Sequence, residues 1–245
     1  MREHELELPS LPVLENGVKE FDIVLSVHQK QQFLTFYELL LQWNAVMNLT
    51  AITNFDEVCR KHFLDSISLC RAISCNDTLN LIDVGTGAGF PGIPLKIVFP
   101  ELKITLLDSL NKRVQFLNEV IQLLDLKDIE AIHGRAEDFA KPGQLRETFD
   151  ICVSRAVANL ATLSEYCLPY VKKDGFFISY KSEKVTEELK TAAHAIDILG
   201  GESYDQIAFY LPNSDLYRNL VVIKKVKETP KKYPRKSGLP SKSPL

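Results

Sequence analysis

The sequence has little that would attach the chain to a membrane or build a disulfide-rich fold. Its five cysteines form no C-x-x-C pair, and an odd number at irregular spacing does not suit a disulfide framework in 245 residues. No apolar run approaches the roughly 20 residues of a bilayer-spanning helix. The acidic N-terminus lacks the basic and apolar regions of a secretion signal. These absences favour a cytoplasmic protein whose thiols are reduced and buried.

The chain also has little net charge, but its charges are unevenly distributed. The formal net charge is −3, although residues 224–245 hold eight lysines or arginines against Glu228 alone. That segment carries +7, which leaves −10 on residues 1–223. A basic end punctuated by proline and glycine is typical of a tail that lies along phosphates. A tail that only improves solubility fits the composition equally well.

The composition, 45% hydrophobic and 25% charged, is that of a globular protein, and its N-terminal third is expected to be helical. Apolar residues from Phe33 to Met47 recur every three or four positions, as on one face of an amphipathic helix. A second helix is predicted to begin at Asn54, a capping residue followed three positions later by Glu57, and to run to Ile73. We expect residues 1–78 to form a helical extension.

From Leu79 onward, short apolar runs alternate with helical patterns, which favours an α/β fold with a parallel sheet covered by helices. Two final runs, 205–212 and 218–226, are predicted to close the sheet as an antiparallel hairpin, giving a seven-stranded, mostly parallel sheet. The sheet domain is expected over residues 79–228 and the basic tail over 229–245. The parallel strands are expected at residues 79–84, 103–108, 129–134, 149–154 and 175–180.

Two of the helices between these strands have recognisable ends. One is predicted over residues 111–124, with Asn111 as its cap and Val114, Leu117 and Ile121 on one face. Another is predicted to stop at Gly200 and Gly201, since glycine is the usual residue just beyond a helix. Helices of this kind would cover the two faces of the sheet.

A glycine-rich turn, DVGTGAGFPG, follows the first predicted strand. Its glycines permit a tight turn and the close approach of a ligand to the backbone, and Pro91 suits the first turn of the next helix. The second strand ends at Asp108, about twenty residues further on, where a carboxylate can accept hydrogen bonds from both hydroxyls of a ribose. Together these features predict an adenosine-containing cofactor. The structural alternative is that the glycines only allow close packing and Asp108 only caps a helix.

Two cofactors compete for this turn. Residues 87–92 match the G-x-G-x-x-G pattern of dinucleotide sites, which would indicate NAD. Asp83, Gly85, Gly87 and Gly89 form the denser pattern D-x-G-x-G-x-G, which resembles the first motif of S-adenosylmethionine-dependent methyltransferases. A carboxylate at Asp83 would repel a pyrophosphate, whereas it could help to hold the ammonium group of S-adenosylmethionine directly or through water. We therefore favour S-adenosylmethionine.

The fourth strand, FDICVSRAVANL, limits the methylation chemistry. Enzymes that methylate exocyclic amines of bases usually carry a D/N-P-P-Y/F tetrad here, and residues 153–156 are not one. Methylation of cytosine C5 needs a thiolate, but Cys152 and Cys167 are expected in the core. Chemistries without covalent help remain, such as methylation of guanine N7, whose lone pair carries no proton and needs only to be aligned with the methyl group.

Several blocks resemble one known family, from about Phe33 to the C-terminus. They are WNAVMNLTAI, RKHFLDSI, DVGTGAGFPGIPLKI, LLDSLNKRVQFL, VSRAVANL and YPRKSGLPSKSPL. These blocks are similar to those of the bacterial small-subunit ribosomal RNA guanine-N7 methyltransferase family, also called glucose-inhibited division protein B. The resemblance implies a Rossmann-like class I methyltransferase with an N-terminal helical extension, acting on N7 of one guanine in 16S ribosomal RNA. It also implies ribosomal RNA or the 30S subunit as partner, and we expect a monomer.

The resemblance assigns roles to particular residues. Arg155, immediately beyond an apolar strand, is predicted to position the substrate at the mouth of the site, since a guanidinium can grip a phosphate or a base edge. Phe90 stands where the family commonly has a small or aliphatic residue. No metal-ligating residues are predicted. The predicted cofactor contacts are Asp83, Gly85, Gly87, Gly89, Phe90, Asp108, Ser109, Leu110, Ala136, Glu137 and Arg155.

Weaker candidates, and two other functions, stay open at this stage. His62 is more typical of a packing residue than of a base, because the expected reaction needs no base. A nicotinamide-dependent oxidoreductase would bind NADH instead of the methyl donor. An RNA-binding assembly factor with a vestigial pocket would bind RNA without methyl transfer. The other weaker candidates are Asn48, Arg60, Asp65, Lys112, Arg113 and Lys181.

Overall fold

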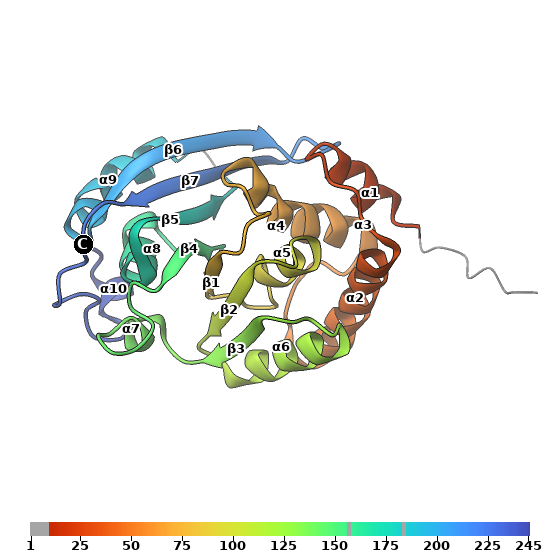
Figure 1. Cartoon of the computed structure of the whole chain (residues 1–245), viewed down its shortest axis with the longest axis horizontal. Helices are drawn as coiled ribbons and strands as arrows, with labels where there is room; N and C mark the ends of the chain where they lie inside the picture. The colour runs from red at the N-terminus through yellow and green to blue at the C-terminus, as the bar shows by residue number, and fades with distance from the viewer. Residues whose placement is uncertain (1–9, 156–157, 183–184) are drawn as a thin grey trace, which may run out of the picture.

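The computed structural model describes residues 10–155, 158–182 and 185–245. The first nine residues and Ala156, the last residue of the fourth-strand tetrad, lie outside this part of the chain. A seven-stranded sheet with strand order β3-β2-β1-β4-β5-β7-β6 runs through the molecule (Figure 1). Strands β1 to β5 pair in parallel, and β7 lies antiparallel between β5 and β6. The predicted mostly parallel sheet with a closing hairpin is confirmed.

The strands lie close to their predicted positions. The largest differences are at β5, which begins four residues early, and at β6, which begins directly after Gly200. β6 starts there because it pairs with β7 from Gly201 opposite Lys225 to Tyr210 opposite Tyr217, with a shift of register between Ser203 and Asp205. The strand bounds are β1 Asn80–Val84, β2 Lys103–Asp108, β3 Ile129–His133, β4 Phe149–Ser154, β5 Val171–Lys181, β6 Gly201–Tyr210 and β7 Tyr217–Lys225.

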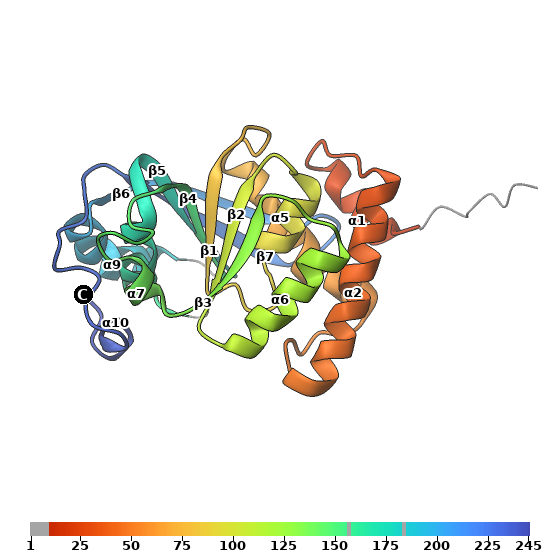
Figure 2. The ribbon, with the colours of Figure 1, turned by 60° about the horizontal axis from the view of Figure 1, so that its bottom comes forward.

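Helices cover both faces of the sheet, and the two sets separate clearly in Figures 1 and 2. One face packs against the helices of the N-terminal extension together with α5 (Gly92–Val98) and α6 (Asn111–Leu123). The other face carries α7 (Ala136–Phe139), α8 (Leu160–Cys167) and α9 (Thr186–Ile198). The predicted cap of α6 is wrong, because Asn111 is its first helical residue and Leu110 occupies the cap position without a side-chain bond.

The N-terminal extension is helical but not separate from the sheet. Ser26 begins α2 with a capping box, and Asn54 accepts the backbone N–H of Glu57 as predicted. The second predicted helix breaks into sections, one of which, Cys59–Leu64, is π-helical. Phe33 and Phe36 of α2 lie in one core with strand residues of the sheet, so the extension has no core of its own. Its elements are α1 Pro12–Lys19, α2 Val27–Met47, α3 Phe55–Val58, the π-helix, α4 Asp65–Ile67 and a 3₁₀ turn at Ser68–Arg71.

The C-terminal segment packs onto the body, on the side of α7 and α9 and away from α2 (Figure 2). Arg235 forms an ion pair with the fully buried carboxylate of Glu165, at 2.6 Å between Nη2 and Oε2. The chain then ends in a short helix, α10 (Leu239–Lys242), where the backbone carbonyl of Pro240 accepts the hydroxyl of Thr162 at 3.1 Å. The tail is therefore part of the folded body, and only some of its basic side chains face solvent.

The cysteines are free, and four of the five are buried, as the sequence indicates. Burial raises the pKa of the Cys59 thiol and the Cys75 thiol to about 12. Burial also raises the pKa of Cys152, on β4, well above its ordinary value. These thiols stay protonated at neutral pH, which agrees with the exclusion of a cysteine nucleophile. Within the described residues, no helix is long and apolar enough to cross a bilayer.

Candidate active site

A cavity of about 290 Å³ lies at the carboxyl ends of the central strands. Gly85 follows β1, Asp108 ends β2 and Ser109 follows it, and Ala136 and Glu137 come after β3. The cavity therefore gathers five of the predicted cofactor contacts, which are far apart in the sequence. It lies beside the boundary between β1 and β4, where the strand order reverses, and this is where open α/β sheets bind their ligands.

The glycine-rich turn forms a backbone wall next to this cavity. Gly85, Gly87 and Gly89 all have positive φ angles, between 61° and 87°, which side-chain-bearing residues rarely adopt. A Cβ atom at Gly87 would point into open space. A Cβ atom at Gly92 would lie only 2.2 Å from Cδ2 of Leu106. Thus Gly87 leaves room for a ligand, whereas Gly92 lets helix α5 approach the sheet.

Asp83 holds the turn from beneath and does not line the cavity. Its side chain is completely buried. Its Oδ2 accepts the hydroxyl of Thr86 at 2.7 Å and the backbone N–H of Gly92 at 2.9 Å. Its Oδ1 is buried and has no hydrogen-bond partner among the described residues. Burial, partly offset by those two hydrogen bonds, raises the pKa of Asp83 to about 6.

Asp108 lies at the end of β2 and on the cavity wall. Its Oδ2 accepts the backbone N–H of Gly87 at 2.9 Å, and its Oδ1 accepts that of Leu110 at 2.9 Å. Nη1 of Arg113 lies 3.4 Å from Oδ2. Each carboxylate oxygen can accept more than one hydrogen bond, so Asp108 both fixes the glycine turn and keeps acceptor capacity for hydroxyl groups.

Glu137 lines the cavity and is tied to the C-terminal segment. Its side chain is almost fully buried, and its Oε1 accepts the backbone N–H of Gly238 at 2.7 Å. Tyr166 of α8 also lines the cavity. The basic tail thus contacts a wall of this cavity.

Arg155 and Phe90 form a second group, between the glycine turn and the extension. The guanidinium carbon of Arg155 lies 5.1 Å from the centre of the Phe90 ring. The ring of His62 stacks on the ring of Phe90, with 4.6 Å between the two ring centres. Phe90 is 5% exposed and also contacts Phe36. An aromatic residue here therefore fills the junction of turn and extension, which a small residue would leave empty.

The predicted residues thus fall into two groups. The side chains of Arg155 and Phe90 are not among those that line the described cavity, and Leu110 is half exposed beyond Asp108. Among the weaker candidates, Arg113 lines the cavity, Lys181 binds Glu188 at 2.7 Å, and Asn48 ends α2 with a φ of 52°. Sequence reasoning missed Leu163 and Tyr166, because nothing distinguishes them from other residues of an amphipathic helix.

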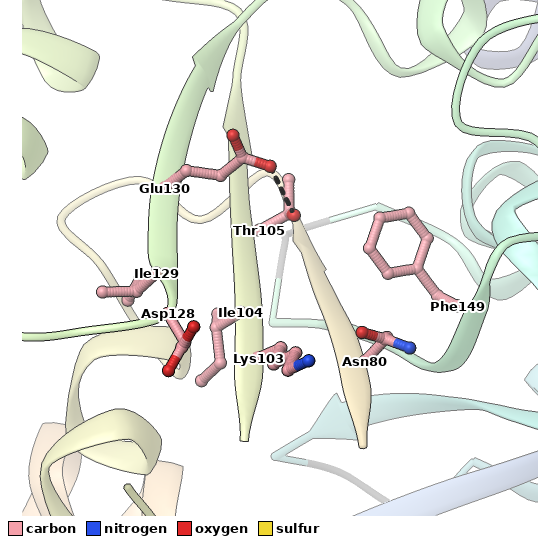
Figure 3. Close-up of a pocket in the computed structure, with 8 residues that line it drawn as sticks. All are labelled: Asn80, Lys103, Ile104, Thr105, Asp128, Ile129, Glu130 and Phe149. Carbon is pink, nitrogen blue, oxygen red and sulfur yellow. Dashed lines mark hydrogen bonds between the residues drawn. The ribbon is translucent and has the colours of Figure 1, made fainter. Parts of the chain in front are cut away.

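A second hollow lies at the opposite edge, over the first residues of β1, β2 and β3 (Figure 3). Asn80, Lys103 and Asp128 surround it, and Thr105 donates a hydrogen bond to Glu130 at 3.2 Å. Ligands of open α/β sheets bind at the carboxyl ends of the strands, and none of the predicted site residues reaches this hollow. It is therefore not the candidate active site.

The strand order and the glycine turn define the class I methyltransferase fold. A dinucleotide-binding sheet has the order 3-2-1-4-5-6, whereas here the antiparallel β7 lies between β5 and β6. The fold is similar to that of an S-adenosylmethionine-dependent methyltransferase from Aquifex aeolicus, with a TM-score of 0.51 and 20% identity. That match covers 68% of this chain and 93% of the other. The predicted fold class is confirmed.

The family model of rRNA small subunit methyltransferase G matches residues 29–216. Ribosomal RNA small subunit methyltransferase G of Lachnoclostridium phytofermentans is 57% identical over 229 residues, which cover 94% of this chain and 95% of the relative. The protein of the same name from Acetivibrio thermocellus is 54% identical over the full length of both chains. The chain belongs to the ribosomal RNA small subunit methyltransferase G family, and the resemblance in its sequence is confirmed.

Proposed function

We propose that the protein transfers the methyl group of S-adenosylmethionine to N7 of a guanine in 16S ribosomal RNA. The observation that carries this proposal is the cavity at the ends of β1, β2 and β3, where a glycine turn meets Asp108. Membership of the family supports the class of substrate. The topology and the relatives do not support a nicotinamide-dependent oxidoreductase or a non-catalytic assembly factor.

The residues of the cavity suit the adenosine part of this donor. The space over Gly87 and the acceptor capacity of Asp108 suit the ribose, and Ala136 and Glu137 lie where the adenine would end. Bound there, the donor supplies an electrophilic methyl group on a sulfonium. Arg155 lies at the neighbouring end of β4, and we assign it to positioning of the substrate, as its guanidinium suits a phosphate or a base edge.

Methylation at N7 also agrees with the way in which the ionisable side chains near the cavity are held. Asp108 and Glu137 each accept backbone N–H groups. Burial, followed by the charge of Arg155, lowers the pKa of His62 to about 3, so this imidazole is neutral. N7 of guanine carries no proton. Methyl transfer to this nitrogen therefore depends on aligning it with the methyl group rather than on removing a proton. A site built from backbone and fixed carboxylates can perform it.

We expect the RNA to contact exposed lysines of the tail. Lys231, Lys232, Lys236 and Lys242 are exposed, whereas Arg235 is bound to Glu165. Cationic side chains on the surface attract phosphates, and such binding weakens with salt. We further propose that the enzyme acts as a monomer in the cytoplasm, on ribosomal RNA or on the 30S subunit.

Methyl transfer can be tested directly with labelled donor. Purified protein is incubated with donor and small ribosomal subunits from cells that lack the enzyme, and the labelled nucleotide is mapped. We expect label at N7 of one guanine. Naked 16S RNA and assembly intermediates serve as parallel substrates. No incorporation into any of the three would refute the enzymatic function, and label on another atom would refute the N7 assignment.

Replacing Asp108 should weaken donor binding. We expect Asp108→Ala to cost about 1 to 3 kcal/mol of binding free energy, because the ribose hydroxyls lose a charged acceptor and the Gly87 N–H loses its partner. Titration calorimetry with S-adenosylmethionine measures this loss. Asp138→Ala is the matched control, since Asp138 is exposed, pairs with Lys141 and does not line the cavity. Equal donor affinities of the two variants would contradict the assignment.

A further inference from the structure

Asp65, at the start of α4, is bound by two arginines that are remote in the sequence. Its Oδ2 accepts Nη1 of Arg155 at 2.9 Å, and its Oδ1 accepts Nε of Arg218 at 2.7 Å. Arg155 follows β4, whereas Arg218 belongs to β7. Asp65 is 5% exposed, so both pairs are shielded from solvent. One carboxylate therefore joins the extension, the end of β4 and the last strand.

The other face of Arg155 is held by the π-helix of the extension. Its Nη1 lies 3.3 Å from the carbonyl oxygen of Lys61, and its Nη2 lies 3.4 Å from Nδ1 of His62. A guanidinium can only donate, so the contact with Arg155 favours an unprotonated Nδ1. Nε2 of His62 lies 2.8 Å from the hydroxyl of Thr50. These two contacts place the imidazole between Arg155 and the extension.

The charges of this group do not cancel. Two guanidinium groups share one carboxylate, and the neighbouring imidazole is neutral because burial and Arg155 lower its pKa to about 3. Together these four side chains carry one surplus positive charge. The side chain of Arg155 is 18% exposed, whereas that of Asp65 is 7% exposed. An anionic group of a ligand would meet this surplus at Arg155, while Asp65 remains covered.

Net stability gives little reason for this arrangement. A buried ion pair contributes little net stability, and apolar residues of similar size often replace one without loss. Here Arg218 holds the carboxylate of Asp65, and this carboxylate in turn restricts the direction and the distance of the Arg155 guanidinium. Ser154, the residue before Arg155, lines the cofactor cavity. The direction of the guanidinium is thereby fixed relative to the cavity.

We propose that Asp65 is a positioning residue for Arg155, and that Arg218 holds Asp65 in the orientation that this requires. The proposal rests on the proposed function, because it concerns the residue assigned to position the substrate. Asp65 and Arg218 act through Arg155 and do not touch the reactants. The effect of changing either of them should therefore depend on the presence of Arg155.

A double-mutant cycle separates positioning from folding. We expect Asp65→Asn to lower kcat/KM for methylation of 30S subunits about 10- to 100-fold, because a misdirected guanidinium no longer aligns the substrate. In an Arg155→Ala background, the same change should lower kcat/KM less than about twofold, since no guanidinium remains to be positioned. Asp56→Asn, an exposed carboxylate of the same extension, is the matched control and should leave kcat/KM unchanged.

Thermal unfolding of every variant is measured alongside the kinetics. Equal losses from Asp65→Asn with and without Arg155, or wild-type kcat/KM in Asp65→Asn, would overturn the proposal. If Asp65→Asn does not fold, Arg218→Lys provides the same cycle, since a lysine keeps the charge but not the Nε geometry. The decrease in kcat/KM caused by Arg218→Lys must likewise disappear in the Arg155→Ala background. Failure of the proposed function would be seen separately, as a wild-type protein that transfers no methyl group.

Discussion

Replacing Arg235 by alanine is expected to destabilise the protein by about 3 to 5 kcal/mol, because it leaves the charge of Glu165 buried without its ionic partner. Arg235 binds both carboxylate oxygens of Glu165, at 2.6 Å through Nη2 and at 2.9 Å through Nε. Glu165 has no solvent-exposed side-chain surface. The backbone N–H of residue 235, at 2.7 Å from Oε1, stays in place and favours the lower end of this range.

Urea unfolding measures this loss of stability. Lys236→Ala is the control, because it removes a charge from the adjacent, exposed position of the same tail, and we expect it to change stability by less than about 0.5 kcal/mol. Arg235→Ala should also weaken donor binding, since the tail it anchors supplies the Gly238 N–H to Glu137. Equal stabilities of the two variants would show that the ion pair does not anchor the tail.

Replacing Asp83 by asparagine is expected to stabilise the donor-free protein at high pH. Burial raises the pKa of Asp83 from 3.8 to about 6, so the folded protein binds this proton more tightly than the unfolded chain does. The favourable contribution is complete below about pH 4 and is lost as the pH rises to about 6. Above that pH, an ionised carboxylate in this position costs up to about 3 kcal/mol relative to a neutral side chain.

Asparagine imitates the protonated carboxyl group at every pH and can still accept from Thr86 and Gly92. The difference in unfolding free energy between Asp83→Asn and the wild type should therefore be near zero at pH 4 and grow towards pH 8. Urea unfolding at several pH values measures it, with Asp77→Asn, an exposed position, as control. A difference that does not change with pH would mean that Asp83 is ionised throughout.

The local elements of the fold were predictable because each has a short-range cause. Alternating apolar runs gave the five parallel strands and the hairpin. The cap at Asn54, and Gly200 one residue beyond the cap of α9, lie where side-chain bonding and positive φ favour them. The glycine turn was predictable for the same reason, since its conformation depends on residues within one short segment. Asp108 could be placed because it ends a strand next to that turn.

Long-range pairings could not be predicted from a single sequence. Nothing in the pattern of the tail indicates that Arg235 binds Glu165 or that Gly238 reaches Glu137. The same holds for Asp65, whose two partners lie 90 and 153 positions away. The burial of Asp83 beneath the turn could not be predicted either, because a sequence does not show the direction in which a side chain points. The predicted roles of individual residues in binding and catalysis therefore remain predictions.

The π-helical section at Cys59–Leu64 makes this part of the chain intolerant of changes in length. Successive residues of an α-helix are about 100° apart around its axis, so losing one residue there would turn α4 by roughly a quarter of a revolution. Asp65 would then face away from both arginines, although every residue of the cluster would still be present. Comparisons of related enzymes should consequently keep the spacing between His62 and Asp65 as a unit, since composition alone does not preserve the geometry.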